Sequence, residues 1–434
     1  MAPLSGYSLR PGNVVCSAHT TRSTLASPRA LTARRRRPAI DVLLLTGEYP
    51  PQCGGVADYT RELARALVVL GVGVRVLTSA PPEGSAASSQ GPSDAPPGDD
   101  DPWPLARVVR SWGLSGLLDL RRRVVASGCE IAHIQYQTAA FGMGPAVNLL
   151  PLALRGGPRT VVTMHDLRVP YLFPKAGPVR TLANRLLIAA ADAAILTDPV
   201  DFAAAERWKR TRRYQVPIGS NIPVAPPPGY DRASIRRRLG LGPDDVLLGY
   251  FGMLNASKGV ETLVDALARL RAAGVPARLA LIGDEIGAAD PTNAVYRDAV
   301  LDRIDRLGLG SAVIRTGRLP ATAVSAHLLA LDVCVLPFRD GASFRRGSLI
   351  AALAHGLPIV TTHLPGKGAP ALVDEKQAIL VPPDDPAALA AAIARASSDP
   401  AIRARLSSSA RQLAERFTWP EIARQVLAIY QAVR

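Results

Sequence analysis

The sequence predicts an α/β protein of two doubly wound domains that face a central cleft. First, its 434 residues exceed what one hydrophobic core usually holds, and 48% of them are hydrophobic. Second, from Ile40 onwards short β-branched or Leu-rich runs alternate with amphipathic helices, which is typical of a parallel sheet covered on both faces. Third, this alternation stops at a Pro/Gly-rich stretch, residues 217–229, and then restarts.

Short apolar runs between polar turns mark the expected strands. In the first domain they are residues 41–45, 74–77, 106–109, 131–134, 160–163, 193–196 and 213–216. In the second they are residues 246–251, 278–282, 313–316, 333–336, 359–361 and 379–381. The expected organisation is a disordered basic leader (1–39), an N-terminal domain (40–220) with a mobile loop (79–104), a linker (221–231), a C-terminal domain (232–416) and a last helix (417–434).

The net charge of +15 is concentrated at the start of the chain. Residues 1–40 contain seven arginines and no acidic residue, so 15 − 7 leaves +8 for the rest. Such a leader fits a transit peptide, a nucleic-acid arm or an upstream extension. Because the Arg, Ala and Pro bias runs through the whole chain, we expect a disordered extension and no nucleic-acid partner.

The cysteine pattern and the hydropathy exclude several classes of protein. The four cysteines, Cys16, Cys53, Cys129 and Cys334, follow no metal-ligand spacing, so we expect neither a zinc site nor a disulfide framework. No apolar run reaches membrane-spanning length. We therefore expect a cytoplasmic enzyme.

A lysine stands where one expected strand turns into a helix. The strand 246–251 ends at Gly252, and Asn255 and Lys258 lie in the turn before an amphipathic helix. Free amides, the helix dipole and an ammonium group together attract an anion, so this turn suits a diphosphate. Only 5 of the 51 basic residues are lysines. The alternative is a solvated lysine in the first turn of an ordinary helix.

The first strand of the N-terminal domain also leads into a glycine-containing turn. Gly54 and Gly55 precede the expected helix 56–70, so the backbone can approach a phosphate or a sugar closely. A Gly-Gly pair alone is more often only a turn. Tyr59 lies in the first turns of the same helix and is a candidate acceptor contact.

Polar residues end two further strands of this domain. His165 and Asp166 follow one strand, and Gln135 and Tyr136 follow the strand before it. The carboxyl ends of parallel strands meet at one edge of a sheet, so these side chains predict a polar acceptor pocket. A single strand-end histidine is as often structural as functional.

From residue 40 to residue 434 the chain resembles retaining GT-B glycosyltransferases of family 4. The segments that carry the resemblance are EYPPQCGGVADYTRELA, HIQYQ, TMHDL, PIGSNIP, GYFGMLNASKGVETLVDAL, LIGD and ALAHGLPIVTT. The resemblance implies two Rossmann-like domains, of which the second mainly binds a nucleotide-diphosphate sugar and the first mainly binds the acceptor. It also implies transfer with retention, without a metal ion or a cofactor.

The resemblance further assigns roles to individual residues. Lys258 would neutralise the leaving diphosphate, Gly55 would approach the donor phosphates, and His165 would sit near the transferred sugar, with Asp166 beside it. The last helix, within 417–434, would cross back onto the N-terminal domain.

Three positions depart from the family pattern. Met253 stands where an arginine is usual, and Ser343 and Ala351 stand where two glutamates seven residues apart are usual. The second glutamate typically holds the ribose and the first holds the sugar. One interpretation of these losses is an inactive site.

The segment that contains Ser343 offers replacements for the missing groups. Arg345 and Arg346 are expected to bind phosphate, since guanidinium groups do so bidentately. Gly347 and Ser348 suit a helix start with free amides, Ser343 remains a donor-binding candidate, and Asp340 is a spare carboxylate.

Three functions remain open on the residues alone. They are an active glycosyltransferase, a catalytically silent GT-B subunit that binds nucleotide or sugar, and an epimerase with the same two-domain shell. The acceptor is a glycan, a lipid or a small molecule. The expected helix 179–188 carries Arg180 and Arg185 among apolar residues, which allows peripheral contact with an anionic membrane at its inner face. The alternative is an ordinary helix that covers the sheet.

Overall fold

The computed structural model describes residues 40–52, 54–81, 101–167, 177–208, 211–283, 291–364 and 372–434. All of them belong to one unit of tertiary contacts, residues 38–434. The leader predicted for residues 1–39 lies outside the described residues, as do Cys53, most of the predicted loop 79–104 and Asp284, the last residue of the LIGD segment.

The N-terminal domain is built on a seven-stranded parallel sheet. Its strands are β1 (Asp41–Thr46), β2 (Gly73–Ser79), β3 (Leu105–Val109), β4 (Ile131–Tyr136), β5 (Arg159–Met164), β6 (Ala193–Leu196) and β7 (Arg212–Gln215), in the spatial order β3-β2-β1-β4-β5-β6-β7. Leu44 of β1 pairs with Val76 on one side and with His133 on the other. All six residues of β4 are buried, as expected for a strand covered on both faces.

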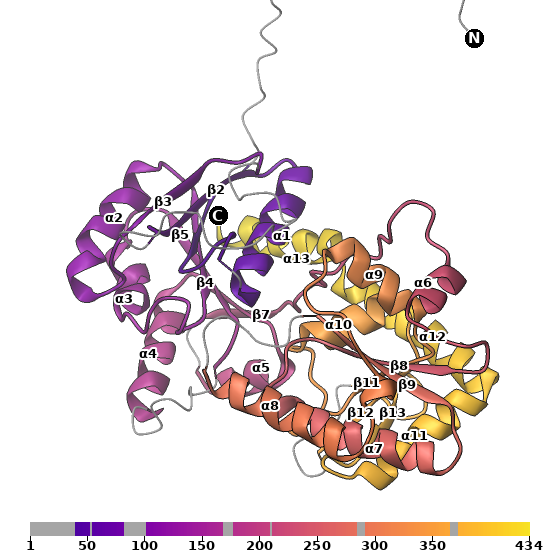
Figure 1. Cartoon of the computed structure of the whole chain (residues 1–434). Helices are drawn as coiled ribbons and strands as arrows, with labels where there is room; N and C mark the ends of the chain where they lie inside the picture. Colours follow the sequence, from indigo (N-terminus) through magenta and orange to yellow (C-terminus); the bar gives the residue numbers. More distant parts are fainter. Residues whose placement is uncertain are drawn as a thin grey trace, which may run out of the picture. The chain divides into compact units, whose positions relative to one another are not determined.

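Helices cover both faces of this sheet (Figure 1). Leu63 of α1 (Gly55–Val69) and Tyr430 of α13 (Trp419–Val433) share the core on one face. On the other face lie η2 (Leu114–Gly116), α2 (Leu117–Ala126), α3 (Ala146–Ala153) and α4 (Gly177–Ala190). Within the described ranges, no helix is long and apolar enough to cross a membrane.

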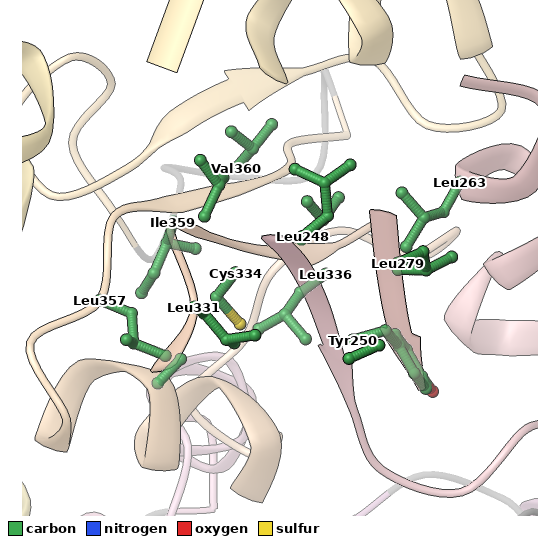
Figure 2. Close-up of a cluster of buried hydrophobic side chains, with 14 of the residues drawn as sticks. Leu248, Tyr250, Leu263, Leu279, Leu331, Cys334, Leu336, Leu357, Ile359 and Val360 are labelled. Atoms are coloured by element: carbon green, nitrogen blue, oxygen red, sulfur yellow. The ribbon is translucent and has the colours of Figure 1, made fainter. Parts of the chain in front are cut away.

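The C-terminal domain is built on a six-stranded parallel sheet. Its strands are β8 (Val246–Phe251), β9 (Ala277–Ile282), β10 (Val313–Arg315), β11 (Val333–Leu336), β12 (Ile359–Thr362) and β13 (Ile379–Val381), in the order β10-β9-β8-β11-β12-β13. Figure 2 shows Leu248, Cys334 and Ile359 of three adjacent strands within the buried core. The predicted strands of both domains are therefore confirmed, with ends that differ by one or two residues.

The remaining helices connect these strands or flank the C-terminal sheet. They are α5 (Pro199–Ala205), α6 (Arg232–Arg238), η4 (Ala256–Lys258), α7 (Val260–Ala272), α8 (Pro291–Arg306), η5 (Gly310–Ala312), α9 (Ala321–Ala330), α10 (Gly347–Ala354), α11 (Pro386–Ser398), α12 (Pro400–Ala414) and η6 (Glu415–Phe417). Three of them begin at an aspartate followed by proline, namely at Asp198, Asp385 and Asp399. Each aspartate accepts a hydrogen bond from a backbone amide of the first turn, which stabilises the start of the helix.

The strand order reverses once in each sheet. In the first sheet the reversal lies between β1 and β4, and in the second it lies between β8 and β11. In open α/β sheets ligands bind at such a switch point, beyond the carboxyl ends of the two central strands. The loops after β8 and β11 carry Lys258 and Arg346, so both residues lie at the expected place for a ligand.

The predicted mobile loop 79–104 is too long at both ends. Ser79 is the last residue of β2. Trp103 is buried, and its indole N–H donates to the Tyr49 hydroxyl at 3.0 Å. Asp101 accepts a hydrogen bond from the same hydroxyl at 2.6 Å and pairs with Arg61 at 3.0 Å. A large aromatic ring and a paired carboxylate therefore anchor residues 101–104, although the segment as a whole is polar.

Candidate active site

Lys258 lies directly over Gly252 at the end of β8. The backbone of Gly252 has a φ of +127°, a conformation that side-chain-bearing residues rarely adopt. A Cβ atom at this position would lie 2.9 Å from the Lys258 ammonium nitrogen and 3.9 Å from the Ser348 Cβ. Glycine at 252 therefore leaves the space that the lysine occupies.

Gly259 holds the loop after β8 against the loop after β11. Its φ is +62°, and a Cβ atom there would overlap the carbonyl oxygen of Pro337. The backbone N–H of Arg339 donates to the Ser257 carbonyl at 3.0 Å across the same junction. The turn that carries Lys258 is thus fixed to the segment that leads to Arg346.

Arg346 reaches the turn that carries Lys258. One guanidinium nitrogen donates to the Ser257 hydroxyl at 3.2 Å, and another pairs with Asp340 at 2.5 Å. The guanidinium lies 5.0 Å from the centre of the Phe338 ring, within cation–π range. An arginine therefore stands beside Lys258 even though residue 253 is a methionine.

The two cations influence each other. Burial, and to a smaller extent the positive charge of Arg346, lower the pKa of Lys258 to about 8. An anion between the two side chains would relieve this repulsion and raise the pKa of the lysine again. The pair is therefore suited to a ligand with more than one negative charge.

The other predicted donor residues near this pair shape the turn and the start of α10. The Asn255 side chain accepts a hydrogen bond from Ser257 at 2.8 Å, and its carbonyl accepts from the Lys258 amide at 3.0 Å. Gly347 and Ser348 are the first residues of α10, whose N-cap, Arg346, makes no side-chain cap hydrogen bond. The positive end of this helix dipole therefore lies beside the lysine.

Arg345 and Ser343 are held by carboxylates of the N-terminal domain. The Arg345 guanidinium lies 3.0 Å from Asp198 and 2.6 Å from Asp201. Ser343 donates to the other oxygen of Asp198 at 2.9 Å. The sequence pattern predicted that both residues contact the donor. In this structure an ion pair holds Arg345 and a hydrogen bond holds Ser343 on the N-terminal domain, and Arg346 is the arginine that accompanies Lys258.

Sequence reasoning missed both of these aspartates. Burial raises the pKa of Asp201 to about 6, although the charge of Arg345 acts in the opposite direction. The half-buried Asp166, a predicted catalytic residue, lies close enough for its charge to raise the Asp201 pKa a little further. One signal was available: Asp198 follows the strand 193–196 and precedes Pro199, the pattern of a helix start at a strand's carboxyl end.

The start of α1 already holds a carboxylate. Glu48 accepts hydrogen bonds from the amides of Val56 and Ala57, both at 3.2 Å. Its side chain lies against Gly54, the N-cap of the helix, whereas a Cβ atom at Gly55 would meet nothing within 4 Å. The predicted phosphate contacts of Gly54 and Gly55 therefore require Glu48 to share these amides or to move. Burial raises the pKa of Glu48.

His165 is a neutral side chain held by Gln135 and Tyr59. One ring nitrogen lies 3.1 Å from the side-chain oxygen of Gln135, and the ring packs edge-on against Tyr59 with centroids 4.6 Å apart. Burial lowers the pKa of His165 to about 3. A neutral imidazole suits a hydrogen bond to a hydroxyl group and carries no charge of its own.

Gln135, Tyr136 and Tyr59 are buried. Tyr136 hydrogen-bonds with Asn148 and Thr138 at 3.1 and 3.2 Å, and Gln135 hydrogen-bonds with His165. The sequence pattern predicted that all three contact the acceptor. The structure places their side chains inside the domain, because helices cover both faces of β4 and Tyr59 lies on the core-facing side of α1. There Gln135 and Tyr59 position His165.

Models of two protein families match the chain. A model described as "Glycosyl transferase 4-like domain" matches residues 54–219, and one described as "Glycosyl transferases group 1" matches residues 245–399. The first range lies within the N-terminal domain, from α1 onwards, the second includes every strand of the C-terminal sheet, and together they include most of the chain. The chain is a glycosyltransferase of the GT-B fold.

Similar proteins carry related names. The glycosyltransferase is 29% identical to the GDP-mannose-dependent alpha-(1-6)-phosphatidylinositol monomannoside mannosyltransferase of Mycolicibacterium smegmatis, over 86% of this chain and 93% of that one. It is 28% identical to the D-inositol 3-phosphate glycosyltransferase of Corynebacterium urealyticum, over 58% of this chain and only 60% of that one. Anabaena HepE, solved in complex with UDP, has the same fold, with a TM-score of 0.70, 19% identity and coverage of 91% and 100%.

Proposed function

We propose that this glycosyltransferase transfers a sugar from a nucleotide-diphosphate sugar to a glycan, lipid or small-molecule acceptor, with retention at the anomeric carbon. The observation that carries the proposal is the pair formed by Lys258 and Arg346 at the switch point of the C-terminal sheet. Two cations beside the start of a helix match the charge that develops on a departing nucleoside diphosphate.

The proposed chemistry is electrostatic. As the bond between the anomeric carbon and the diphosphate oxygen breaks, negative charge grows on the leaving group. Lys258 and Arg346 stabilise that charge without a metal ion or a cofactor, and the dipole of α10 adds to their effect. Preorganisation by Ser257, Gly259 and Asp340 means that little rearrangement is needed during the reaction.

The acceptor is proposed to bind on the N-terminal domain beside His165. Its neutral imidazole would hydrogen-bond to a sugar hydroxyl, and Gln135 would keep the ring oriented. We assign the enzyme to the cytoplasm. The relatives' printed names, which include an inositol phosphate and a phosphatidylinositol mannoside, support a polyol-containing acceptor for this chain as well.

A two-step experiment tests the proposal. A thermal-shift panel of UDP, GDP, ADP and their sugars identifies the nucleotide, because a ligand at about 100 times its dissociation constant adds roughly 2.7 kcal/mol of stability. Release of nucleoside diphosphate from the stabilising sugar donor is then measured with and without candidate acceptors. Acceptor-dependent release supports transfer. A protein that binds the nucleotide sugar but never cleaves it to a nucleoside diphosphate would instead be a silent subunit.

A further inference from the structure

Helix α4 presents an apolar stripe to solvent. Val179, Leu182 and Leu186 follow each other at helical spacing and are 71%, 67% and 37% exposed. The opposite side of the helix packs on the sheet, and it includes the polar residues Arg180 and Asn184, which are 7% and 1% exposed. The usual arrangement of a surface helix, with apolar residues inside and polar residues outside, is thus partly inverted.

A second apolar stripe lies in the same layer of helices. Leu114, Leu118 and Val125, from η2 and α2, are 60%, 67% and 47% exposed. Helix α3 packs against both α2 and α4, so the two stripes belong to one layer on one face of the N-terminal sheet (Figure 1). We call this layer, made of η2, α2, α3 and α4, the outer layer.

The outer layer is also basic. Helices α2, α3 and α4 expose four arginines, namely Arg121, Arg122, Arg123 and Arg185, but contain one acidic residue, Asp119. Asp119 pairs with Arg123 at 2.7 Å. Arg121 and Arg122 are exposed next to Leu118 and Val125, so positive charge and apolar side chains alternate along α2.

We propose that the outer layer docks on the surface of an anionic lipid bilayer. Apolar side chains that enter the acyl boundary, with arginines at the level of the headgroups, are the combination that holds interfacial helices on such membranes. A second protein with an apolar patch would match the leucines but would leave the positive charge of the exposed arginines unbalanced. Charge complementarity therefore selects the lipid surface.

The position of α4 links this surface to the acceptor side. Arg180 donates to the Thr138 hydroxyl at 3.2 Å, and Thr138 donates to Tyr136 at the end of β4. The His165 amide donates to the Tyr136 carbonyl at 3.0 Å. A docked enzyme would therefore hold the His165 edge of the sheet near the membrane, where a lipid-borne acceptor would be presented. This consequence rests on the proposed transfer activity, whereas the docking itself does not.

Vesicle sedimentation tests the docking with the full chain. We expect binding to phosphatidylcholine vesicles that contain phosphatidylglycerol, weaker binding as salt rises, and little binding to phosphatidylcholine alone. The double variant Val179→Ser with Leu182→Ser should reduce the partition coefficient roughly tenfold or more. Arg121→Ala with Arg122→Ala should reduce it about fivefold for each arginine at low salt.

Matched controls come from exposed valines elsewhere in the chain. Val69 on α1 and Val295 on α8 are 80% and 73% exposed, so Val69→Ser and Val295→Ser remove similar apolar area outside the outer layer. They should bind vesicles like the wild type. UDP affinity and melting temperature, measured on every variant, confirm that the fold and the donor site are intact.

Two results would overturn the docking. One is equal binding of the Val179/Leu182 variant and the wild type to phosphatidylglycerol vesicles. The other is absence of vesicle binding by the wild type. If that wild type self-associates in gel filtration and the Val179/Leu182 variant is monomeric, the stripe is assigned to contact between copies of this chain. UDP binding measured in the same samples keeps failure of the docking distinguishable from failure of the donor site.

Discussion

The guanidinium of Arg345 lies 2.6 Å from the carboxylate of Asp201, and this ion pair joins the C-terminal domain to the N-terminal domain. Asp198 shares the same guanidinium at 3.0 Å. Arg346, which follows Arg345 in the sequence, instead contacts the turn that carries Lys258. Two adjacent arginines therefore have different partners.

Arg346→Ala should weaken nucleoside diphosphate binding, and Arg345→Ala should not do so to the same extent. We expect a loss of about 1.5 to 3 kcal/mol for Arg346→Ala, the range for hydrogen bonds to charged groups, and less than half of that for Arg345→Ala. Calorimetric titration with UDP and GDP measures both. Equal losses in the two single variants would mean that Arg345 leaves its aspartates when the nucleotide binds.

Lys258→Met should lower turnover by a factor on the order of ten to a thousand, because a charge on the leaving group is lost while the volume of the side chain is kept. Lys376→Met is the matched control, since Lys376 is exposed on the far turn before β13. Normal turnover of the Lys258 variant would exclude this lysine from the active site.

The affinity for nucleoside diphosphate should fall as pH rises above about 8. The pKa of Lys258 in the free enzyme is lowered to about 8, so at higher pH the lysine must take up a proton before it can attract the anion. Titrations between pH 7 and 9.5 should show this decrease in the wild type and a flatter profile in Lys258→Met. Parallel profiles in the two proteins would contradict the assignment.

Asp201 should make the protein less stable as pH rises from about 4 to 6. Its pKa is raised to about 6 in the folded state, compared with an ordinary value of 3.8, so the folded state holds a proton that the unfolded state has already released. Relative to Asp201→Asn, the unfolding free energy of the wild type should fall by up to roughly 3 kcal/mol over this range.

His165→Ala should impair sugar transfer more than nucleoside diphosphate binding, because His165 belongs to the N-terminal domain and the Lys258 turn belongs to the C-terminal domain. Comparing UDP affinity with acceptor-dependent UDP release measures the two effects separately. With a pKa of about 3, His165 should also add no inflection to the pH–rate profile between pH 5 and 9. An equal loss of binding and transfer would place His165 in the nucleotide site.

A chain that begins at Pro38 should fold and turn over like the full-length protein. Residues 1–37 have no apolar periodicity, so the sequence gives no reason for them to pack on the domains. Yield, melting temperature and turnover of the shortened chain provide the comparison. Loss of soluble protein would show that the leader is needed for folding.

The strands could be read from the sequence because each is a short apolar run between polar turns. The position of Lys258 also followed from local pattern, since a strand, a glycine and a helix are contiguous there. The partners of Arg345 could not be predicted, because Asp198 and Asp201 lie more than 140 residues away and only the fold brings them close. Likewise, the sequence pattern around Glu48 does not show that its carboxylate accepts hydrogen bonds from the backbone amides at the start of α1.

The outward face of α4 was also hidden from sequence reasoning. Its composition allowed either a sheet-covering helix or a membrane-facing one. The structure shows that Leu187 and Ile188 cover the sheet while Leu182 and Leu186 point away from it. A helical wheel cannot say which of two apolar stripes meets the core; only the position of the sheet decides this.

The packing of α13 affects the order in which the two domains fold while the chain is being translated. Tyr430 hydrogen-bonds with the buried His133 at 2.6 Å, and Ile422 and Val426 fill the core beneath β1 and β4. During translation the strands of the first domain are therefore synthesised long before α13, the helix that covers one face of their sheet. Until α13 emerges, one face of that sheet lacks part of its cover, while the second domain can already close its own core. The domain that is synthesised first is thus expected to reach its final structure last.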